Sequence, residues 1–250
     1  MPSADRLDHT VINVKVDMDA AEALFGKLGF TLTPRGYHSH GSMNHLMMFS
    51  TDYLELIGIP EGKEIERKDL EDAPLGINGV VFKAFDVDDI YARLQNVRFD
   101  GDPPKAFHRP VDIDDGQRDA KFRTVTVRDG VFPGGRVYYC EHGTPELVWR
   151  PEWQSHANGV TSMPEFVAVA SDADGEVAQF ATLLDTDVEM DGNGVRCVTL
   201  DGCQVTVLTP DQYSDRYGEL ASTMGSRDAI FGAMVFATED LSMLHDLLDD

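Results

Sequence analysis

One unit recurs four times along the chain: an apolar strand, an acidic turn and an amphipathic helix. The first two copies cover residues 9–30 and 78–99, at an offset of 69 positions, and the last two cover residues 164–185 and 231–248. A repeat of this kind is typical of supersecondary units that bury their apolar faces against their neighbours. The sequence therefore predicts an α+β fold built from four similar modules.

Further strands follow the first helix, over residues 45–50 and 53–59. The stretch HLMMFSTDYLELIG at these strands matches RVYYCEHGTPELVW in the second copy at an offset of 91 positions, so that Glu55 corresponds to Glu146. Each module is therefore expected to be βαβββ, and the larger offset predicts a 22-residue insertion at about residues 100–117. The fourth copy stops after its helix, which predicts a truncated module.

The junction between the second and third modules is rich in Gly, Ser and Asn, a composition typical of linkers. We expect a first domain over residues 1–158, and a second, degenerate and C-terminally incomplete one over residues 159–250. The charged segment 61–74, between the first two modules, is expected to be a solvated linker or a short surface helix.

The charge balance narrows the classes of partner. The chain has 44 acidic residues against 21 Lys and Arg, a formal net charge of −23. Nucleic acid and anionic membranes repel such a surface, so we expect neither as a partner. The chain has no apolar run long enough to span a membrane. Its three cysteines are too few and odd in number for a secreted disulfide framework, which favours a reducing cytoplasm.

The segments LDHTVINV, GYHSHGSMNHLMMF, YLELIG and YYCEHGTPELVWRPEW, in this order, resemble the vicinal oxygen chelate superfamily. Its members include the glyoxalases, the bleomycin-resistance proteins and the extradiol dioxygenases, and the resemblance covers nearly the whole chain. It implies that two modules pair into one cupped, incomplete barrel around a site. It also implies that the first and last strands of each module hold a divalent metal ion.

Under that resemblance, the metal-binding positions of the first module pair are His9, Glu55, Asn78 and Glu146. Asn78 departs from the family pattern, which has His, Gln or Glu there, and its neutral amide is a weaker ligand. We therefore expect His9, Glu55 and Glu146 to bind the ion, with Zn, Mn, Fe and Ni as candidates and Asn78 facing the substrate. Two carboxylates and one imidazole suit a divalent ion that keeps open water positions.

Five other residues are candidates for contact with a substrate. His38 and His40 lie in a Gly-bearing loop, where an imidazole serves as general acid or base, and Asn44 follows with an amide that hydrogen-bonds a carbonyl. Arg150 either clamps a carboxylate or enolate, or pairs with a nearby carboxylate. His142 either contacts the substrate or replaces a metal ligand. Solvated loop histidines remain the alternative for His38 and His40.

The second half is expected to bind no metal, because its corresponding first-strand residues are Pro164 and Phe231. Its strands are apolar, so we expect them to stabilise the first half and the assembly, with a homodimer as the possible oligomer. Two classes of function stay open. The first is a metal-dependent lyase, isomerase or dioxygenase that chelates vicinal oxygens of a small oxygenated substrate. The second is a non-catalytic protein that sequesters a small molecule, as bleomycin-resistance proteins do.

Overall fold

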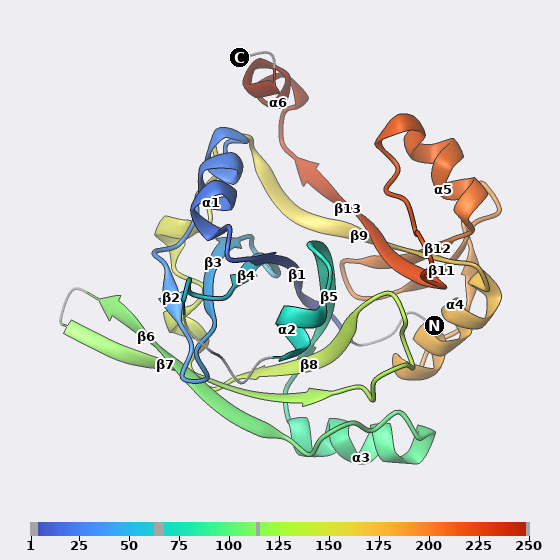
Figure 1. The fold of residues 1–250 in the computed structure, drawn as a ribbon, viewed down its shortest axis with the longest axis horizontal. Coiled ribbons are helices and arrows are strands. Elements are labelled where there is room, and N and C mark those ends of the chain that lie inside the picture. The colour runs from blue at the N-terminus through green and yellow to red at the C-terminus, as the bar shows by residue number, and fades with distance from the viewer. Residues whose placement is uncertain (1–4, 63–67, 114–115, 249–250) are drawn as a thin grey trace.

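The computed structural model describes residues 5–62, 68–113 and 116–248, and their strands form two sheets (Figure 1). The larger sheet has the strand order β2-β3-β4-β1-β5-β8-β7-β6, and the smaller has the order β10-β11-β12-β9-β13. The first module comprises β1 (Leu7–Lys15), α1 (Met18–Lys27), β2 (Gly36–Tyr37), β3 (Met43–Met48) and β4 (Tyr53–Gly58). The second, which follows α2 (Lys68–Asp72), comprises β5 (Gly76–Ala84), α3 (Val87–Val97), β6 (Lys105–Ile113), β7 (Gly116–Thr126) and β8 (Arg136–His142).

The second half repeats the pattern after two short 3₁₀ turns, η1 (Pro145–Leu147) and η2 (Pro151–Trp153). The third module comprises β9 (Val160–Ala170), α4 (Ala173–Leu183), β10 (Glu189–Met190), β11 (Arg196–Thr199) and β12 (Gln204–Leu208). After α5 (Pro210–Tyr217) and η3 (Gly218–Leu220), the fourth module consists of β13 (Ala229–Thr238) and α6 (Leu241–Leu248). The predicted α+β fold of βαβββ modules is therefore confirmed.

Acidic residues begin the helices, as the repeated acidic turn predicts. The side chain of Asp86 accepts a hydrogen bond from the amide of Asp88 at 2.8 Å, and Asp172 accepts one from Gly175 at 3.0 Å. These bonds satisfy amides that the first turn of a helix leaves without partners. Asp17 precedes α1 at the same position but makes no such bond.

The centre of the larger sheet has local two-fold symmetry. β1 and β5 pair antiparallel, with Val11 opposite Gly79 and His9 opposite Val81. Each also pairs parallel with the closing strand of its own module, β1 with β4 and β5 with β8. This symmetry places Gly79 at the position of His9.

The closing strand of the second module is β8, and this corrects the sequence alignment. Val11 pairs with Glu55 across β1 and β4, and Val81 pairs with Tyr138 across β5 and β8. Tyr138 is therefore the register equivalent of Glu55. The prediction that Glu146 lies on the closing strand is wrong, because the chain leaves the sheet after β8. Proline starts both η1 and η2, and it lacks the amide that a strand needs.

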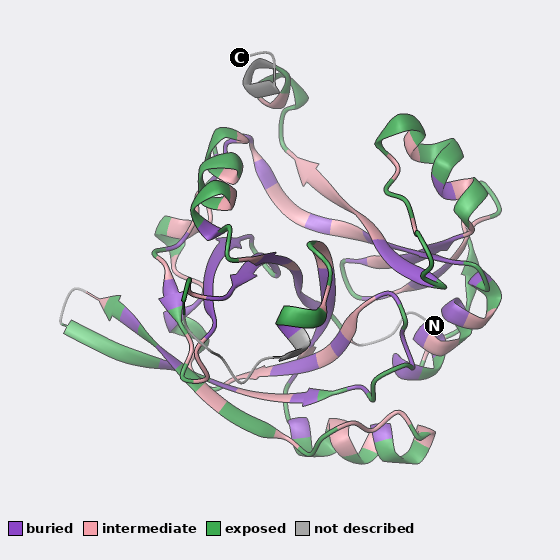
Figure 2. Cartoon of the chain, in the orientation of Figure 1, coloured by how far each residue is buried: buried purple, intermediate pink, exposed green. Residues whose placement is uncertain are grey.

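The predicted 22-residue loop insertion at about residues 100–117 is wrong in size and character, because the extra length of the second module lies mainly in its longer strands: β6 has 9 residues and β2 has 2. β6 occupies residues 105–113 and pairs antiparallel with β7, so this stretch belongs to the module itself. The backbone amide of Ser39 donates to the carbonyl oxygen of His108 at 3.1 Å, which brings the ends of the large sheet together and completes the cup. Figure 2 shows the β6–β7 hairpin projecting with its outer end exposed, whereas β3 and β4 are buried.

One hydrophobic core joins the two halves of the chain. It includes Met18 of α1, Phe82 of β5, Phe180 of α4 and Phe231 of β13. A Cβ atom on Gly135 would lie 2.6 Å from the ring of Phe231, so glycine allows the two sheets to approach closely there. All strands of the larger sheet precede residue 158 and those of the smaller sheet follow it. The domain boundary itself stays a prediction.

The charged segment 61–74 contains a short helix. Part of the segment 61–74 lies outside the described residues, but α2 forms within it and buries Leu70, whose carbonyl accepts from Asn13 at 2.9 Å.

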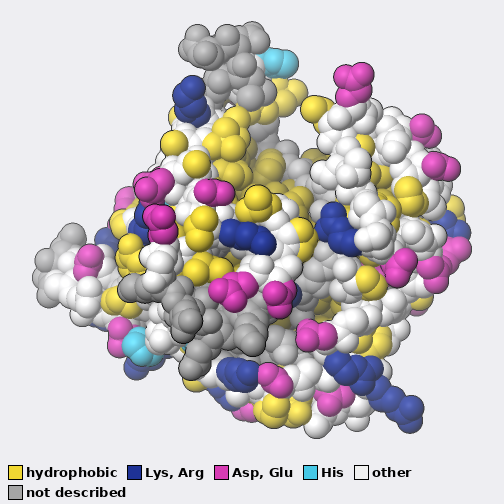
Figure 3. All heavy atoms as spheres, in the orientation of Figure 1, with side chains coloured by type: hydrophobic (Ala, Val, Ile, Leu, Met, Phe, Trp, Pro, Cys, Tyr) yellow, Lys and Arg dark blue, Asp and Glu magenta, His cyan; other side chains and the backbone are white. Residues whose placement is uncertain are grey.

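Figure 3 shows hydrophobic side chains gathered over the region of β9 and β13. β13 is an edge strand, a kind of surface that favours pairing, and the homodimer stays a prediction. Among the described residues no helix is long and apolar enough to cross a membrane.

Candidate active site

The concave face of the large sheet encloses a cavity of about 840 Å³. Strands from both modules line it, together with the loop between β2 and β3. Six of the nine predicted site residues contribute to its wall: His9, His38, His40, Asn44, Glu55 and Asn78. Six predicted residues therefore line one cavity of the first module pair, and their role as the functional site stays a prediction.

His9 is held in one orientation by Asp8. Asp8 is fully buried, and its carboxylate accepts from His9 Nδ1 at 2.7 Å and from His142 Nε2 at 2.9 Å. Burial alone would raise the pKa of Asp8, but the two imidazoles hold this pKa well below its usual range. The carboxylate is therefore charged and fixes the proton of His9 on Nδ1, which leaves Nε2 directed at the cavity.

Glu55 lies beside His9 Nε2. Its Oε2 is 3.7 Å from Nε2, and its Oε1 accepts from Asn44 Nδ2 at 2.7 Å. The hydroxyl of Tyr138 hydrogen-bonds His9 Nε2 at 3.2 Å, as the donor when the His9 proton is on Nδ1. The imidazole of His9 also stacks on the ring of Tyr53, with ring centroids 4.3 Å apart. These contacts give the imidazole a fixed position with an acid and a hydroxyl on either side.

His38 and His40 stand at the wall formed by the β2–β3 loop. His38 shares hydrogen bonds with Ser42 at 2.8 Å and with Asn44 Nδ2 at 3.3 Å. The rings of both histidines pack against Phe107, with centroids 5.6 and 4.9 Å from it. Both therefore lie where a ligand would meet them, and a catalytic role for either stays a prediction.

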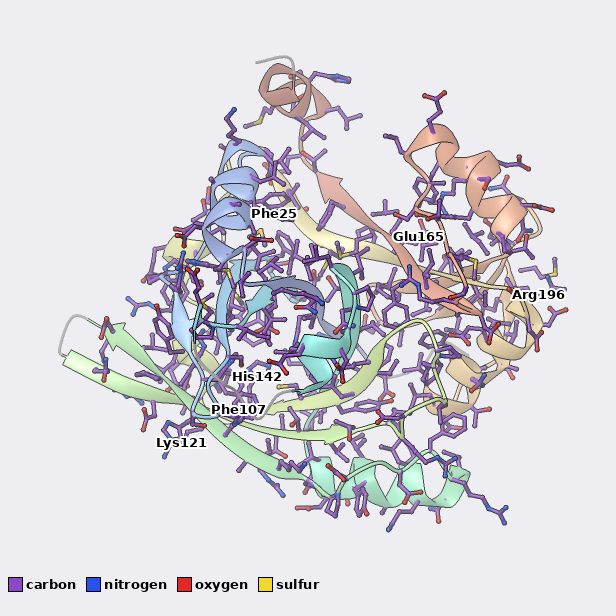
Figure 4. All side chains as sticks on the ribbon, in the orientation of Figure 1. Phe25, Phe107, Lys121, His142, Glu165 and Arg196 are labelled. Carbon is purple, nitrogen blue, oxygen red and sulfur yellow. The ribbon has the colours of Figure 1, made fainter. Side chains whose placement is uncertain are left out.

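Three predicted residues lie elsewhere. Glu146 is 57% exposed, pairs with Arg118 at 3.2 Å and lines a separate hollow. Arg150 hydrogen-bonds Glu152 outside the cavity, which corresponds to the salt-bridge alternative. Strand alternation placed Arg150 inward, but η1 and η2 replace the expected strand. His142 of β8, labelled in Figure 4, does not line the cavity. Its ring packs on Trp149, with centroids 4.8 Å apart, and its Nε2 hydrogen-bonds Asp8.

Asn78 lines the cavity, and its side chain is hydrogen-bonded to the guanidinium of Arg136. Its Oδ1 accepts from Arg136 Nε at 2.9 Å. The register of β5 against β1 shifts at Asn78, which turns this side chain toward the cavity beside Gly79.

The sequence analysis missed three residues that line the cavity and one that orients His9: Tyr138, Arg136, Arg109 and Asp8. Asp8 was detectable, because an acid directly precedes the candidate histidine in LDHTV. Tyr138 and Arg136 required the register of β8, which the alignment misplaced. Arg109 of β6 lies in the stretch interpreted as an insertion, and no local pattern marks it as a cavity residue.

The residues present do not complete the metal site that the resemblance implies. The inward positions on the first and last strands are His9, Glu55, Gly79 and Tyr138, of which only the first two are strong ligands. The amide oxygen of Asn78 accepts from a guanidinium, a poor neighbour for a cation. Catalytic zinc sites use three protein ligands, so the family's metal site does not fit this cup.

A second group has the proximity that a metal site needs. Ligand atoms of Asp8, Cys140 and His142 all lie within 4.8 Å of one another. However, both imidazole contacts of Asp8 are hydrogen bonds, and burial raises the pKa of the Cys140 thiol well above its usual value. A neutral thiol is a poor ligand. This group is a possible metal site by distance, and its observed hydrogen bonds serve to orient His9.

Residues 7–184 match the family model of the glyoxalase-like domain. The chain belongs to the glyoxalase-like family of the vicinal oxygen chelate superfamily. The match covers both modules of the cup and continues into β9 and α4 of the second half. No curated protein matches the sequence of this glyoxalase-like chain.

Solved structures share the fold at low identity. A hypothetical protein from Staphylococcus aureus has a TM-score of 0.66 and 12% identity, covering 83% of this chain and 87% of its own. A mutant of 4-hydroxymandelate synthase from Streptomyces coelicolor has a TM-score of 0.57 and 14% identity, covering 99% and 76%. A xylose isomerase-like TIM barrel/4-hydroxyphenylpyruvate dioxygenase fusion protein has a TM-score of 0.60 and 14% identity, and the chain spans 39% of its length. These likenesses support the glyoxalase-like fold alone.

Proposed function

We propose that this chain is an enzyme whose first cup binds a small oxygenated organic molecule and transfers a proton at His9. The observation that carries the proposal is the buried Asp8–His9 pair, whose Nε2 faces a cavity of about 840 Å³. A charged acid on one ring nitrogen makes the other nitrogen an oriented base. The reaction class it favours is proton abstraction beside a carbonyl, as an isomerase or lyase requires.

The residues divide the work as follows. Asp8 keeps the proton on Nδ1 and stabilises the imidazolium that forms when Nε2 takes a substrate proton. In the free protein the Tyr138 hydroxyl donates to Nε2 at 3.2 Å; once the substrate displaces this bond, the hydroxyl donates to a substrate oxygen as negative charge develops there. Glu55 Oε2, 3.7 Å from Nε2, lies beside the nitrogen that takes the substrate proton. Burial of Asp8 and stacking on Tyr53 hold this geometry before the substrate arrives.

No step is assigned to a metal ion, because His9 and Glu55 are the only strong ligands at the cup's inward positions on the described strands. A divalent ion at these two residues remains the metal-dependent alternative. Elemental analysis of the purified protein separates the two. Stoichiometric metal that is lost in His9→Ala would favour the metal-dependent enzyme over our proposal.

A non-catalytic binding protein is the second candidate. Gly79 and Tyr138 at two of the inward positions favour it, since they remove ligands that enzymes of this superfamily use. Aromatic side chains on the cavity wall, Phe107 and Phe122 among them, would suit the sequestration of a flat ligand.

Exchange of protons beside a carbonyl tests the proposal. We expect the protein to accelerate deuterium incorporation into hydroxyacetone or another member of a panel of small ketones in heavy water, followed by NMR. His9→Gln should abolish the acceleration. His108→Gln is the matched control, because this imidazole is 53% exposed on β6 and does not line the cavity. No acceleration by the wild type would support the binding protein instead, and an unaffected His9→Gln would remove His9 as the base.

A further inference from the structure

We infer that Arg109 binds the carboxylate of an organic acid in the first cup. The ligand class is then a singly charged carboxylate with a flat apolar body. The inference rests on the proposed function of this cavity and names the substrate class that it accepts.

Arg109 is a buried cation with no hydrogen-bonded or ion-paired partner among the described residues. Its residue is 3% exposed, it lines the cavity, and its Nη2 atom is buried without a hydrogen-bond partner among the described residues. The part of the chain that the structure describes also contains no ion pair with this guanidinium. Burial lowers the pKa of Arg109, while the nearby Tyr53 and Glu55 oppose that change.

Burying a guanidinium without a partner is costly, because the group loses its hydration and gains no bond in return. This cost is offset when a bound ligand places a negative charge next to the guanidinium. Arginine has a planar fork that matches the two oxygens of a carboxylate. The guanidinium thus offers, within the cup, a positive charge that the incomplete metal site does not.

The backbone makes room for this arrangement at Gly36. A Cβ atom there would lie 2.5 Å from Asn44 Oδ1 and 3.1 Å from Arg109 Nη1. A larger residue at position 36 would have to displace the Asn44 amide and crowd Arg109, so glycine leaves both side chains room in this arrangement. Asn44 in turn donates to Glu55, so that Arg109 belongs to the same cluster as the proposed acid–base residues.

The aromatic side chains of the cavity wall favour a ligand whose remaining part is flat and apolar. The rings of Phe107 and Phe122 stack 5.1 Å apart, with an interplanar angle of 17°, and both line the cavity with Tyr53 and Tyr138. Flat apolar groups pack well on such rings. Glu55 lies close enough to influence Arg109 and would repel a second negative charge. This favours a carboxylate over a phosphate dianion.

Binding of phenylacetate, compared with its neutral isostere phenylacetamide, tests the inference. In calorimetry at about 10 mM ligand, well above a Kd of ~1 mM, the wild type should bind phenylacetate at least about tenfold more tightly. Arg109→Met should abolish this preference, and Arg109→Lys should retain part of it because lysine keeps the charge without the fork. Arg150→Met, outside the cavity, is the matched control and should bind like the wild type.

Melting temperature shows whether the variant is folded. Arg109→Met should melt no lower than the wild type, and about 2–4 °C higher for each kcal/mol of burial cost removed. No preference for phenylacetate in the wild type, or an unchanged preference in Arg109→Met, overturns the inference. Binding measured in His9→Gln separates the two proposals. A retained preference there, without proton exchange by the wild type, removes the acid–base chemistry and leaves the carboxylate site.

Discussion

The two sheets of this protein share one strand register, but the first surrounds an open cavity and the second is covered by a helix. In the larger sheet, β1 and β4 pair parallel and present His9 and Glu55 to an open cavity. In the smaller sheet, β9 and β12 pair parallel in the same way, with Val167 opposite Thr206 as Val11 is opposite Glu55. The equivalent of Glu55 in the second half is therefore Thr206.

The equivalent of His9 in the second half is Glu165, two residues before Val167. Counting back from the helix selects Pro164, as the sequence analysis did, because the register shift between Asn13 and Lys15 adds one residue to β1. Glu165 accepts from Thr206 at 2.7 Å and from both terminal nitrogens of Arg216 of α5 at 2.8 and 2.6 Å. Figure 4 shows Glu165 near β9 and α5.

Helix α5 occupies the face of the second sheet that corresponds to the open cup. Tyr213 packs in one cluster with Val167, Val169 and Ile230, and its hydroxyl donates to the Gly232 carbonyl at 2.8 Å. The first cup thus exposes an imidazole, an acid and an unpaired guanidinium, whereas the second neutralises its acid with arginine and buries its apolar wall. This difference supports our proposal that the chemistry takes place in the open cup and that the filled cup is structural.

The largest expected effect comes from breaking the orientation of His9. Asp8→Asn removes the charge that fixes the Nδ1 proton, and the proton-exchange rate should fall by about 10³–10⁴-fold, as in other acid–imidazole pairs. The measurement is the NMR exchange assay with the melting temperature followed in parallel. Asp191→Asn, on the second sheet, should leave the rate unchanged. A rate within a few-fold of the wild type in Asp8→Asn would contradict the orienting role.

Removing the side chain that fills the second cup should lower the free energy of unfolding and leave the proton-exchange rate unchanged. Tyr213→Ala removes a buried aromatic ring from under α5, and the free energy of unfolding should fall by about 3–5 kcal/mol in chemical denaturation. Proton exchange by the folded fraction should stay at the wild-type rate. A large loss of rate in the folded protein would show that the second cup contributes to the reaction.

The pH dependence of stability offers a third contrast. Burial, with help from Asp172, raises the pKa of Glu176 in α4 to about 7, so the folded chain holds this proton more tightly than the unfolded chain. That contribution is complete below about pH 4.5 and is lost as the pH rises through 7, which lowers the free energy of unfolding by about 3 kcal/mol. Denaturation of Glu176→Gln across this range should show a smaller fall. Asp52, whose pKa burial raises to about 6, should account for part of the remainder.

The smallest expected effect concerns the salt bridge of the second cup. Arg216 and Glu165 are partly exposed, so Arg216→Met should lower the free energy of unfolding by only about 1 kcal/mol. Arg109→Met in the open cup should not destabilise the protein at all. Urea denaturation of the two variants compares them directly, and equal destabilisation would remove the distinction between a paired and an unpaired arginine.

Local patterns in the sequence predicted what depends on neighbouring residues. Alternation placed His9 and Val11 on one face of β1, and the repeated strand–helix unit predicted the modules. Glu146 failed because the alignment matched β8 with β3, one strand too early, so that Glu146 fell beyond the last strand of its module. Strand pairing rather than sequence similarity determines which residue corresponds to Glu55. Arg109 depends on contact between β2 and β6, which are distant in the chain, so no local signal could reveal it.

The central claim is that Asp8 holds His9 as a base facing the open cup, and the ¹⁵N resonances of the His9 ring test it most directly. The account predicts that Nδ1 carries the proton shared with Asp8, and that the Nε2 resonance shifts when phenylacetate enters the cavity. In Asp8→Asn this preference for the Nδ1 tautomer should be lost. A proton on Nε2 in the wild type, or an Nε2 resonance indifferent to the ligand, would contradict the account.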